Sequence, residues 1–454
     1  MKKNLLLSAL AISAAFSASA GVDPVQYEEA VDGLRCTNKW LVSKALDNEE
    51  FKKLVFSEDY DRCRTATVLG DKVYVGYSHK IEVNGELNSG TAFLVEHDLN
   101  TGEYLRTIQC TLNGEIIEGL LCANQVGTDD FGHLWFAGFR SNIANGTVPV
   151  YVVDDLATGA CSVAFEVSLP EDEAEAAGRV DYFDLVGDVT GKEGPTVFMS
   201  ASCENTDKPY VYGWRRDQGS DKFEPHMADG GYVAQAVEET FPAGQLLFNY
   251  GSMVYISRDE EFSGAMYYVD GFTTYPTLYN TEGGMIESFA SAPDQQPLDA
   301  QCNGVVEFSL GDDFYIAYPI SQYNKGEGWQ FRVCKLGPDM AFEGMQTLWD
   351  LPKGGMGTIS DGGMRIHDLK VQKHVDANGN EAVYLFNYKC NGGMGVYEIA
   401  QPEYNSGING VEVADSNAPV EYFNLNGIRM NENNLPAGLY ITRQGDKVSK
   451  LIVK

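Results

Sequence analysis

Short runs of aromatic and β-branched residues recur along the chain at nearly constant intervals. The runs start at positions 73, 134, 197, 254, 314 and 383, so successive starts are 61, 63, 57, 60 and 69 residues apart. The six runs are Val73–Gly76, Leu134–Ala137, Val197–Ser200, Val254–Ser257, Phe314–Ala317 and Val383–Phe386. Such residues are enriched in β-strands, and a fixed period marks a repeated structural unit. The pattern therefore predicts six copies of one small β unit.

Turn-forming residues separate the strands within each unit. A cluster of Gly, Asp or Asn precedes every run, and these residues supply the positive φ that tight hairpins need. An Asp-Leu-x-Thr-Gly turn occurs at Asp98–Gly102 and again at Asp155–Gly159, 57 residues later. It predicts a second hairpin in the unit, and a further apolar strand precedes the first turn. Each unit is therefore expected to contain four antiparallel strands.

Six four-stranded units predict an all-β fold, a six-bladed β-propeller, with seven blades as the alternative. A pair of β-sandwiches would explain the strands but not their regular spacing. The sixth unit has no strand after Gly395–Ala400, so the segment Thr37–Ser43 near the N-terminus is expected to complete its sheet. This closure would leave no unpaired edge in the ring.

The N-terminus has the three parts of a secretory signal peptide. Lys2 and Lys3 are followed by the apolar stretch Leu5–Phe16 and by small residues at Ala18–Ala20. This order predicts cleavage before Gly21 and an exported protein. The apolar stretch is too short to span a bilayer, which takes about 20 residues. No later segment of the sequence is long and apolar enough to do so, and no transmembrane segment is predicted.

The C-terminal residues form a second region with three predicted strands, at 420–425, 438–443 and 448–453. The region resembles the C-terminal sorting domain, type A, of cargo proteins of the type IX secretion system. The residues that carry the resemblance are Asn424, Gly427, Gly438, Tyr440 and Lys454. The resemblance implies a small β-sandwich-like domain, the type IX machinery as a partner, and a product that is secreted or attached to the outer cell surface. It leaves open whether the domain is cleaved.

These features divide the chain into five segments. They are the signal peptide 1–20, an N-terminal linker 21–35, the propeller 36–402, a linker 403–418 and the sorting domain 419–454. The chain has 33 Lys and Arg against 65 Asp and Glu, a formal net charge of -32. This acidic excess disfavours nucleic acid and anionic lipid as partners, since both are bound through clustered basic residues.

The nine cysteines and six histidines show no metal-binding or redox spacing. Several cysteines recur at similar distances from the strand runs, which predicts small buried core residues, with one or two disulfides left open. The sequence contains no HExxH, GxSxG or P-loop motif. Asp376–Asn380 begins like a calcium loop, but Glu381 stands where an EF-hand has glycine, so we expect a hairpin turn. We predict no metal or cofactor, find no support for calcium, and assign no catalytic residue.

A ligand site in a propeller is expected where the innermost strands meet around the central channel. The polar residues near the starts of these predicted strands are Arg64, Asn124, Asp181, Gln245, Asn303, Arg365 and His367. Such a ring of donors and acceptors suits a small polar ligand or a sugar. The sequence therefore favours a non-catalytic propeller that binds a ligand, a glycan or a surface protein. The alternative is a propeller hydrolase or lyase that acts on a glycan or lactone at the channel.

Overall fold

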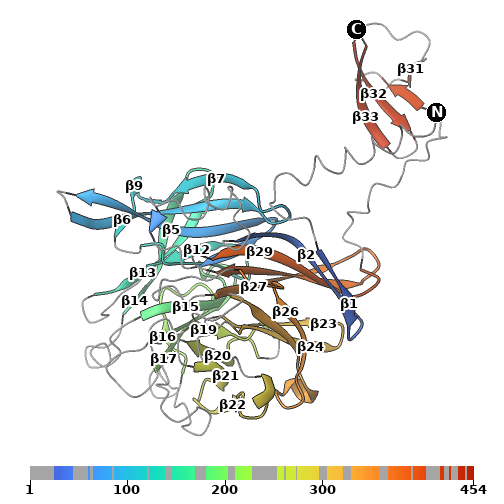
Figure 1. Ribbon diagram of the computed structural model, residues 1–454. Coiled ribbons are helices and arrows are strands. Elements are labelled where there is room, and N and C mark those ends of the chain that lie inside the picture. The colour runs from blue at the N-terminus through green and yellow to red at the C-terminus, as the bar shows by residue number, and fades with distance from the viewer. Residues whose placement is uncertain are drawn as a thin grey trace. The chain divides into compact units, whose positions relative to one another are not determined.

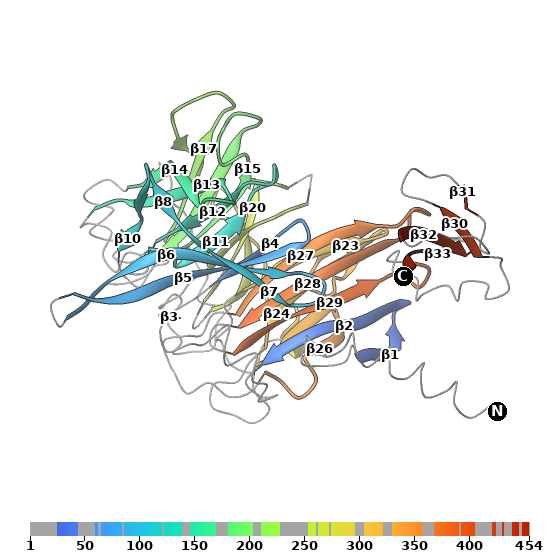
Figure 2. The same ribbon diagram turned by 90° about the horizontal axis from the view of Figure 1, so that it is seen from above.

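The strand runs of the repeat lie in six sheets that follow one another along the chain (Figures 1 and 2). The computed structural model describes residues 25–43, 60–61, 65–83, 86–119, 122–138, 146–168, 180–202, 210–227, 253–259, 262–271, 274–295, 304–320, 329–356, 367–389, 392–404, 420–423, 429–430, 438–444 and 447–453. The predicted signal peptide lies outside these residues. The chain divides into two units, residues 1–374 with 381–402, and residues 375–380 with 403–454.

The first three blades come from the first half of the chain. Blade 1 contains β4 (Ala66–Leu69), β5 (Lys72–Val83), β6 (Glu86–Asp98) and β7 (Tyr104–Gln109), with β3 (Tyr60–Asp61) and β10 (Glu118–Gly119) added. Blade 2 contains β11 (Gln125–Thr128), β12 (Leu134–Ala137), β13 (Val148–Asp155) and β14 (Ala160–Val167), extended by β8 (Thr111–Leu112) and β9 (Glu115–Ile116). Blade 3 contains β15 (Val180–Gly187), β16 (Thr196–Ser202), β17 (Tyr210–Arg216) and β18 (Glu224–Pro225).

The other three blades complete the ring. Blade 4 contains β19 (Met253–Ile256), β20 (Met266–Gly271), β21 (Thr274–Asn280) and β22 (Met285–Glu287). Blade 5 contains β23 (Val306–Leu310), β24 (Asp313–Pro319), β25 (Phe331–Lys335) and β26 (Gln346–Leu351). Blade 6 contains β27 (His367–Val375), β28 (Glu381–Lys389), β29 (Gly393–Ala400), β2 (Leu34–Ser43) and β1 (Val25–Val31). Two 3-10 turns, η5 (Pro293–Gln295) and η6 (Pro338–Met340), lie between strands. The predicted six-bladed propeller is confirmed.

The sixth blade is closed by the N-terminal strand, as the sequence predicted. Strand β2 pairs antiparallel with β29, with Val42 opposite Met394. Figure 1 shows this blue strand beside the orange-red strand β29. Strand β1 pairs in turn with β2. The residues expected to be a linker, 21–35, therefore contain β1 and the start of β2.

The fourth blade differs from the expectation. Five of the six runs lie in the second strand of their sheet, but the run at Val254 lies in β19, the first described strand of blade 4. Here β19 lies beside β15, and Ile256 N donates to the Asp184 carboxylate. The run Tyr267–Val269 in β20 takes the second position. Strands β19 and β20 have a similar apolar composition, so the sequence did not indicate which of them is the second strand of the blade.

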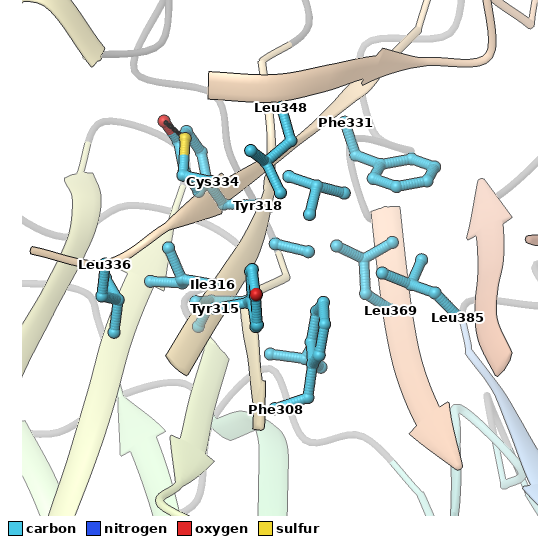
Figure 3. Close-up of a cluster of buried hydrophobic side chains, with 14 of the residues drawn as sticks. Phe308, Tyr315, Ile316, Tyr318, Phe331, Cys334, Leu336, Leu348, Leu369 and Leu385 are labelled. Atoms are coloured by element: carbon cyan, nitrogen blue, oxygen red, sulfur yellow. Dashed lines mark hydrogen bonds between the residues drawn. The ribbon is translucent and has the colours of Figure 1, made fainter. Parts of the chain in front are cut away.

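Aromatic and aliphatic side chains fill the spaces between neighbouring blades. Figure 3 shows one such cluster, in which Phe308 and Tyr315 of blade 5 face Leu369 and Leu385 of blade 6. Phe308 and Tyr315 stack with ring centroids 5.2 Å apart. The five described cysteines, Cys36, Cys110, Cys122, Cys161 and Cys334, are buried free thiols. Of the cysteines at recurring positions, for which a small core role is predicted, Cys122 is described and buried, while Cys63, Cys203, Cys302 and Cys390 lie outside the described residues.

The predicted turns have the expected chemistry. Gly102 and Gly159, which end the two Asp-Leu-x-Thr-Gly turns, have φ of 76° and 74° and donate their N–H to Asp98 and Asp155. Asp376 accepts backbone bonds from Asn378 and Asn380, so the calcium-like segment is a hairpin turn.

The second unit contains a separate antiparallel sheet. Its strands are β30 (Val420–Phe423), β31 (Arg429–Met430), β32 (Gly438–Gln444) and β33 (Lys447–Val453), in the order β31-β30-β32-β33. The three strands predicted here correspond to β30, β32 and β33. The described strands within residues 420–453 form one sheet, while the prediction was a sandwich-like domain.

Candidate functional site

The first strands of the six blades enclose a cavity of about 420 Å³. Every blade contributes to its lining, which is the arrangement of a central propeller cavity. The lining includes Thr67 of β4, Gln125 and Thr128 of β11, Asp184 of β15, Tyr255 of β19, Glu307 and Ser309 of β23, and Lys370 and Gln372 of β27. The segments after β11 and β19 add Asp129, Asp130, Arg258 and Asp259.

An aromatic side chain forms part of the cavity wall next to β11. Trp135 is 2% exposed, and its ring lies directly against Gly127 of the innermost strand. A Cβ atom at position 127 would lie 2.4 Å from Cζ2 of Trp135, so only glycine leaves room for the indole. The wall here is closely packed, which fixes the shape of the cavity.

Arg258 joins the third and fourth blades at the cavity. Its guanidinium donates to Asp184 Oδ1 at 2.7 Å and to the Leu185 carbonyl at 2.9 Å. It also lies 5.2 Å from the centroid of the Tyr255 ring. Burial alone would lower the pKa of Arg258, but the neighbouring Asp184 carboxylate raises it above the usual range. Arg258 is therefore a fixed cation.

Glu307 joins the fourth and fifth blades in a similar way. Its Oε1 accepts from the Ser257 hydroxyl and from Arg258 N at 2.8 Å. Its Oε2 accepts from the Tyr268 hydroxyl at 3.0 Å. Both oxygens are thus engaged in contacts that fix β23 against blade 4. Each oxygen of the Glu307 carboxylate therefore already has a hydrogen-bond partner within the protein.

Similar polar contacts join other pairs of blades. Gln125 of β11 exchanges two hydrogen bonds with the backbone of Phe183 in β15. Asp368 of β27 accepts from Ala66 N at 3.2 Å and pairs with Lys370 at 2.9 Å. Burial raises the pKa of Asp368, and the charge of Lys370 opposes this shift. Polar side chains of the first strands therefore serve as links between neighbouring blades.

One group among the described residues brings three potential metal ligands together, at the edge of the cavity. Oxygen and nitrogen atoms of Asp129, His133 and Asp188 lie within 4.8 Å of one another. His133 Nδ1 is 2.8 Å from Asp129 Oδ2 and 3.3 Å from Asp188 Oδ1. The carboxylates also accept backbone N–H groups, Asp129 from Val189 and Asp188 from Glu193. Burial raises the pKa of Asp188, but hydrogen bonds from the Glu193 N–H and the Thr190 hydroxyl and N–H outweigh it and lower the pKa to about 2. The group resembles a zinc ligand set in composition, but its atoms already connect blades 2 and 3.

The cavity is lined by positions within the first strands, such as Gln125, Asp184 and Glu307, whereas the sequence predicts a ring near the starts of these strands. Arg64, Gln245, Asn303 and Arg365 lie outside the described residues, as do the sorting residues Asn424, Gly427 and Lys454. Asp181, His367, Gly438 and Tyr440 lie in described strands, but the structure does not describe side chains at these four positions. Asn124 immediately precedes β11, is 1% exposed, and is not in the cavity lining. Of the predicted ring residues, Asn124 is therefore the one whose side chain the structure describes, and it lies outside the cavity lining.

The sequence interpretation missed Asp184, Arg258 and Glu307. Two of them had a local signal, because a carboxylate stands between apolar neighbours in Phe183-Asp184-Leu185 and in Val306-Glu307-Phe308. A charge within an apolar strand needs a partner when it is buried. The partner, Arg258, lies 74 positions from Asp184, so only the fold could supply it.

Comparisons with solved structures place the chain among β-propellers. The chain is similar to a DUF4623 family protein from Bacteroides eggerthii, at 12% identity and a TM-score of 0.50, covering 83% of this chain and 75% of that one. It is also similar to a polysaccharide lyase, at 9% identity and a TM-score of 0.36, covering 76% and 91% of the two chains. A third similar structure is an exo-1,5-α-L-arabinanase from a bovine ruminal metagenomic library, at 10% identity and a TM-score of 0.32, covering 67% and 95%. At these identities the first likeness shows the fold alone, and the lower TM-scores carry no argument about activity.

No family model and no curated protein matches the sequence. Within the part of the chain that the structure describes, no helix has the length and apolar character needed to cross a membrane.

Proposed function

We propose that this protein is an exported, non-catalytic propeller that binds a glycan in its central cavity. The cavity combines an aromatic wall with polar groups from several blades, the combination that ligand pockets use to fix orientation. The described lining contains three cations, Arg258, Lys370 and Lys373, and they are paired with the carboxylates of Asp184, Asp368 and Glu381, respectively. This internal pairing is the observation that carries the proposal, because cations that are already paired with carboxylates favour a neutral ligand over an anionic one.

The same contacts favour binding over hydrolysis or elimination. A glycosidase needs two carboxyl groups that reach the scissile bond, one of them able to donate a proton. Both oxygens of Glu307 accept hydrogen bonds from blade 4, and both oxygens of Asp184 accept from blade 4 as well. Moving either carboxylate toward a substrate would break a contact between blades. Catalysis by these two carboxylates would therefore need a conformational change that binding does not.

A blocked cavity tests this proposal. Ser309 lines the cavity from β23, and Ser309→Trp places an indole in the space that a sugar ring would occupy. We expect at least tenfold weaker glycan binding in calorimetry of residues 21–454, against neutral oligosaccharides of glucose, mannose and xylose. The control Ser162→Trp, on the exposed outer strand β14, should leave affinity within twofold.

Two outcomes would contradict the proposal. Equal affinity of the Ser309→Trp variant and the unmodified protein would place the ligand elsewhere. Release of shortened or unsaturated sugars during long incubation with the unmodified protein, and not with Ser309→Trp, would establish the enzyme alternative.

We further propose that the C-terminal unit directs export by the type IX secretion system to the cell exterior or surface. The support is the combination of the N-terminal signal pattern with the sorting-like residues named above. In a host that has this system, a chain lacking residues 419–454 should accumulate inside the outer membrane, while the full chain reaches the surface or medium. Equal amounts of both chains outside the cell would overturn this part of the proposal.

A further inference from the structure

The turn between β11 and β12 carries an exposed aromatic side chain next to the cavity. Phe131 is 44% exposed, and it follows Asp129 and Asp130, which both line the cavity. The other large exposed aromatic side chain among the described residues, Tyr104, is 42% exposed and lies on the outer strand β7. Exposed apolar residues are common by themselves. Phe131 differs from Tyr104 because its turn supplies two residues of the cavity lining, although Phe131 itself is not one of the lining residues.

The turn that carries Phe131 is held by its own side chains. Asp129 Oδ1 accepts from Phe131 N at 3.0 Å and from His133 N at 2.7 Å. Asp129 Oδ2 accepts from Val189 N at 2.8 Å, so the same carboxylate attaches the turn to blade 3. The backbone that presents Phe131 is therefore fixed before any ligand binds.

Neighbouring residues of blade 3 complete the support. Asp130 Oδ2 accepts from Gly187 N at 2.7 Å, and Asp130 N donates to the Gly187 carbonyl at 3.2 Å. The Phe131 ring rests on Gly194, where an added Cβ would lie 2.9 Å from the ring atom Cζ. The ring therefore has blade 3 on one side, and Phe131 is 44% exposed. A group that is already ordered loses little conformational entropy on binding, so a stacked ligand gains more affinity.

We propose that Phe131 forms an outer sugar-binding subsite, so that the ligand is a neutral oligosaccharide that extends from the central cavity over the turn between blades 2 and 3. This inference rests on the proposed function of the cavity. The apolar face of a sugar ring packs on an aromatic ring through dispersion and the negative π face. The charge of -32 repels anionic glycans, and the carboxylates of this turn are engaged with backbone N–H groups.

Chain length of the ligand provides the test. Calorimetry of residues 21–454 would compare β-1,4-linked glucose, mannose and xylose oligosaccharides of two and of six units. We expect Phe131→Ala to weaken binding of the longer oligosaccharide about tenfold and to leave the shorter one within twofold. Phe131→Trp should keep the longer ligand within threefold of the unmodified protein. The control Tyr104→Ala removes an equally exposed aromatic ring and should change neither affinity.

A second variant separates the position of the ring from its presence. Gly194→Ala keeps Phe131 but pushes its ring outward, so binding of the longer ligand should weaken severalfold while the fold is kept. If the unmodified protein binds both lengths and Phe131→Ala changes neither, the subsite is wrong and the cavity proposal stands. If the unmodified protein binds neither length, the cavity proposal fails and the subsite fails with it. Preferred binding of a hexameric oligogalacturonide would overturn the choice of a neutral ligand.

Discussion

Blades 5 and 6 build the same kind of antiparallel sheet from very different parts of the chain. Blade 5 uses four consecutive strands within residues 306–351, whereas blade 6 joins β27, β28 and β29 to β2 near the N-terminus. Across this junction Asn38 donates to the Val396 carbonyl, 358 positions away. Closing such a loop costs more chain entropy than closing a hairpin. Five blades thus rest on local pairing, and the ring depends on one distant strand.

Removing the distant strand β2 should abolish the closure of the ring at blade 6. A chain that begins at residue 44 lacks β1 and β2, so β29 would expose its backbone groups and blade 6 would lose one wall of its core. We expect the cooperative unfolding transition in urea, followed by circular dichroism, to be lost or shifted to a far lower midpoint. A chain that begins at residue 32 lacks only β1 and should keep the transition. An unchanged midpoint for the shorter chain would show that the ring does not need β2.

Trp40 is the side chain of β2 whose loss should cost most. It is fully buried, and its Nε1 donates to the Leu99 carbonyl of blade 1 at 2.7 Å. Trp40→Ala should destabilise the protein by about 4 kcal/mol, the range for large aromatic truncations in cores. Trp135→Ala, in the contiguous blade 2, is the matched variant with a similar expected cost.

Hydrogen exchange distinguishes these two tryptophan variants. In Trp40→Ala we expect faster exchange concentrated in β2 and β29, because the closing strand can detach while the other sheets persist. In Trp135→Ala faster exchange should centre on blades 2 and 3. The same exchange pattern in both variants would mean that closure is no weaker than the local blades.

His97 makes the stability of blade 1, whose turn contacts Trp40, sensitive to acid. Its ring is buried in blade 1, with Nδ1 at 3.3 Å from the Gly102 carbonyl. Burial lowers the pKa of His97 to about 4, and the bond to Gly102 opposes this only in part. Below about pH 6.5 the unfolded chain binds this proton and the folded chain does not. Stability that is complete above that pH is therefore lost as the pH falls toward 4, by about 3 kcal/mol in all.

Urea unfolding at pH 7, 5.5 and 4.5 measures this effect. His97→Gln removes the titrating group, so its stability should fall less steeply with pH than that of the unmodified protein. Parallel pH profiles for the two proteins would show that His97 is not responsible.

The local blades were accessible from the sequence, and the contacts between blades were not. Spacing of the apolar runs located the strands, and the unpaired run at Thr37–Ser43 identified the closing strand, because each of these signals lies within a few residues. The position of the Val254 run in its sheet was missed, since neighbouring strands share its composition. Glu307 and Arg258 were missed because their roles depend on partners that only the ring brings together. For the same reason the sequence did not indicate which positions line the cavity, and Asn124 of the predicted ring lies just before β11 and outside that lining.

Gly102 gives the smallest and sharpest test of how the closing strand is held. It has φ of 76°, and a Cβ there would lie 2.7 Å from the Trp40 ring. Gly114 is the matched control, because it has φ of 83° and open space around its Cα. Alanine at either site pays about 1 kcal/mol of backbone strain, but only Gly102→Ala also displaces Trp40, for about 1–2 kcal/mol more. Urea unfolding should therefore show that Gly102→Ala is less stable than Gly114→Ala. When each substitution is combined with Trp40→Ala, the two should lower the free energy of unfolding by the same amount. If the difference persists without Trp40, the closing strand does not depend on the fit between this indole and the turn of blade 1.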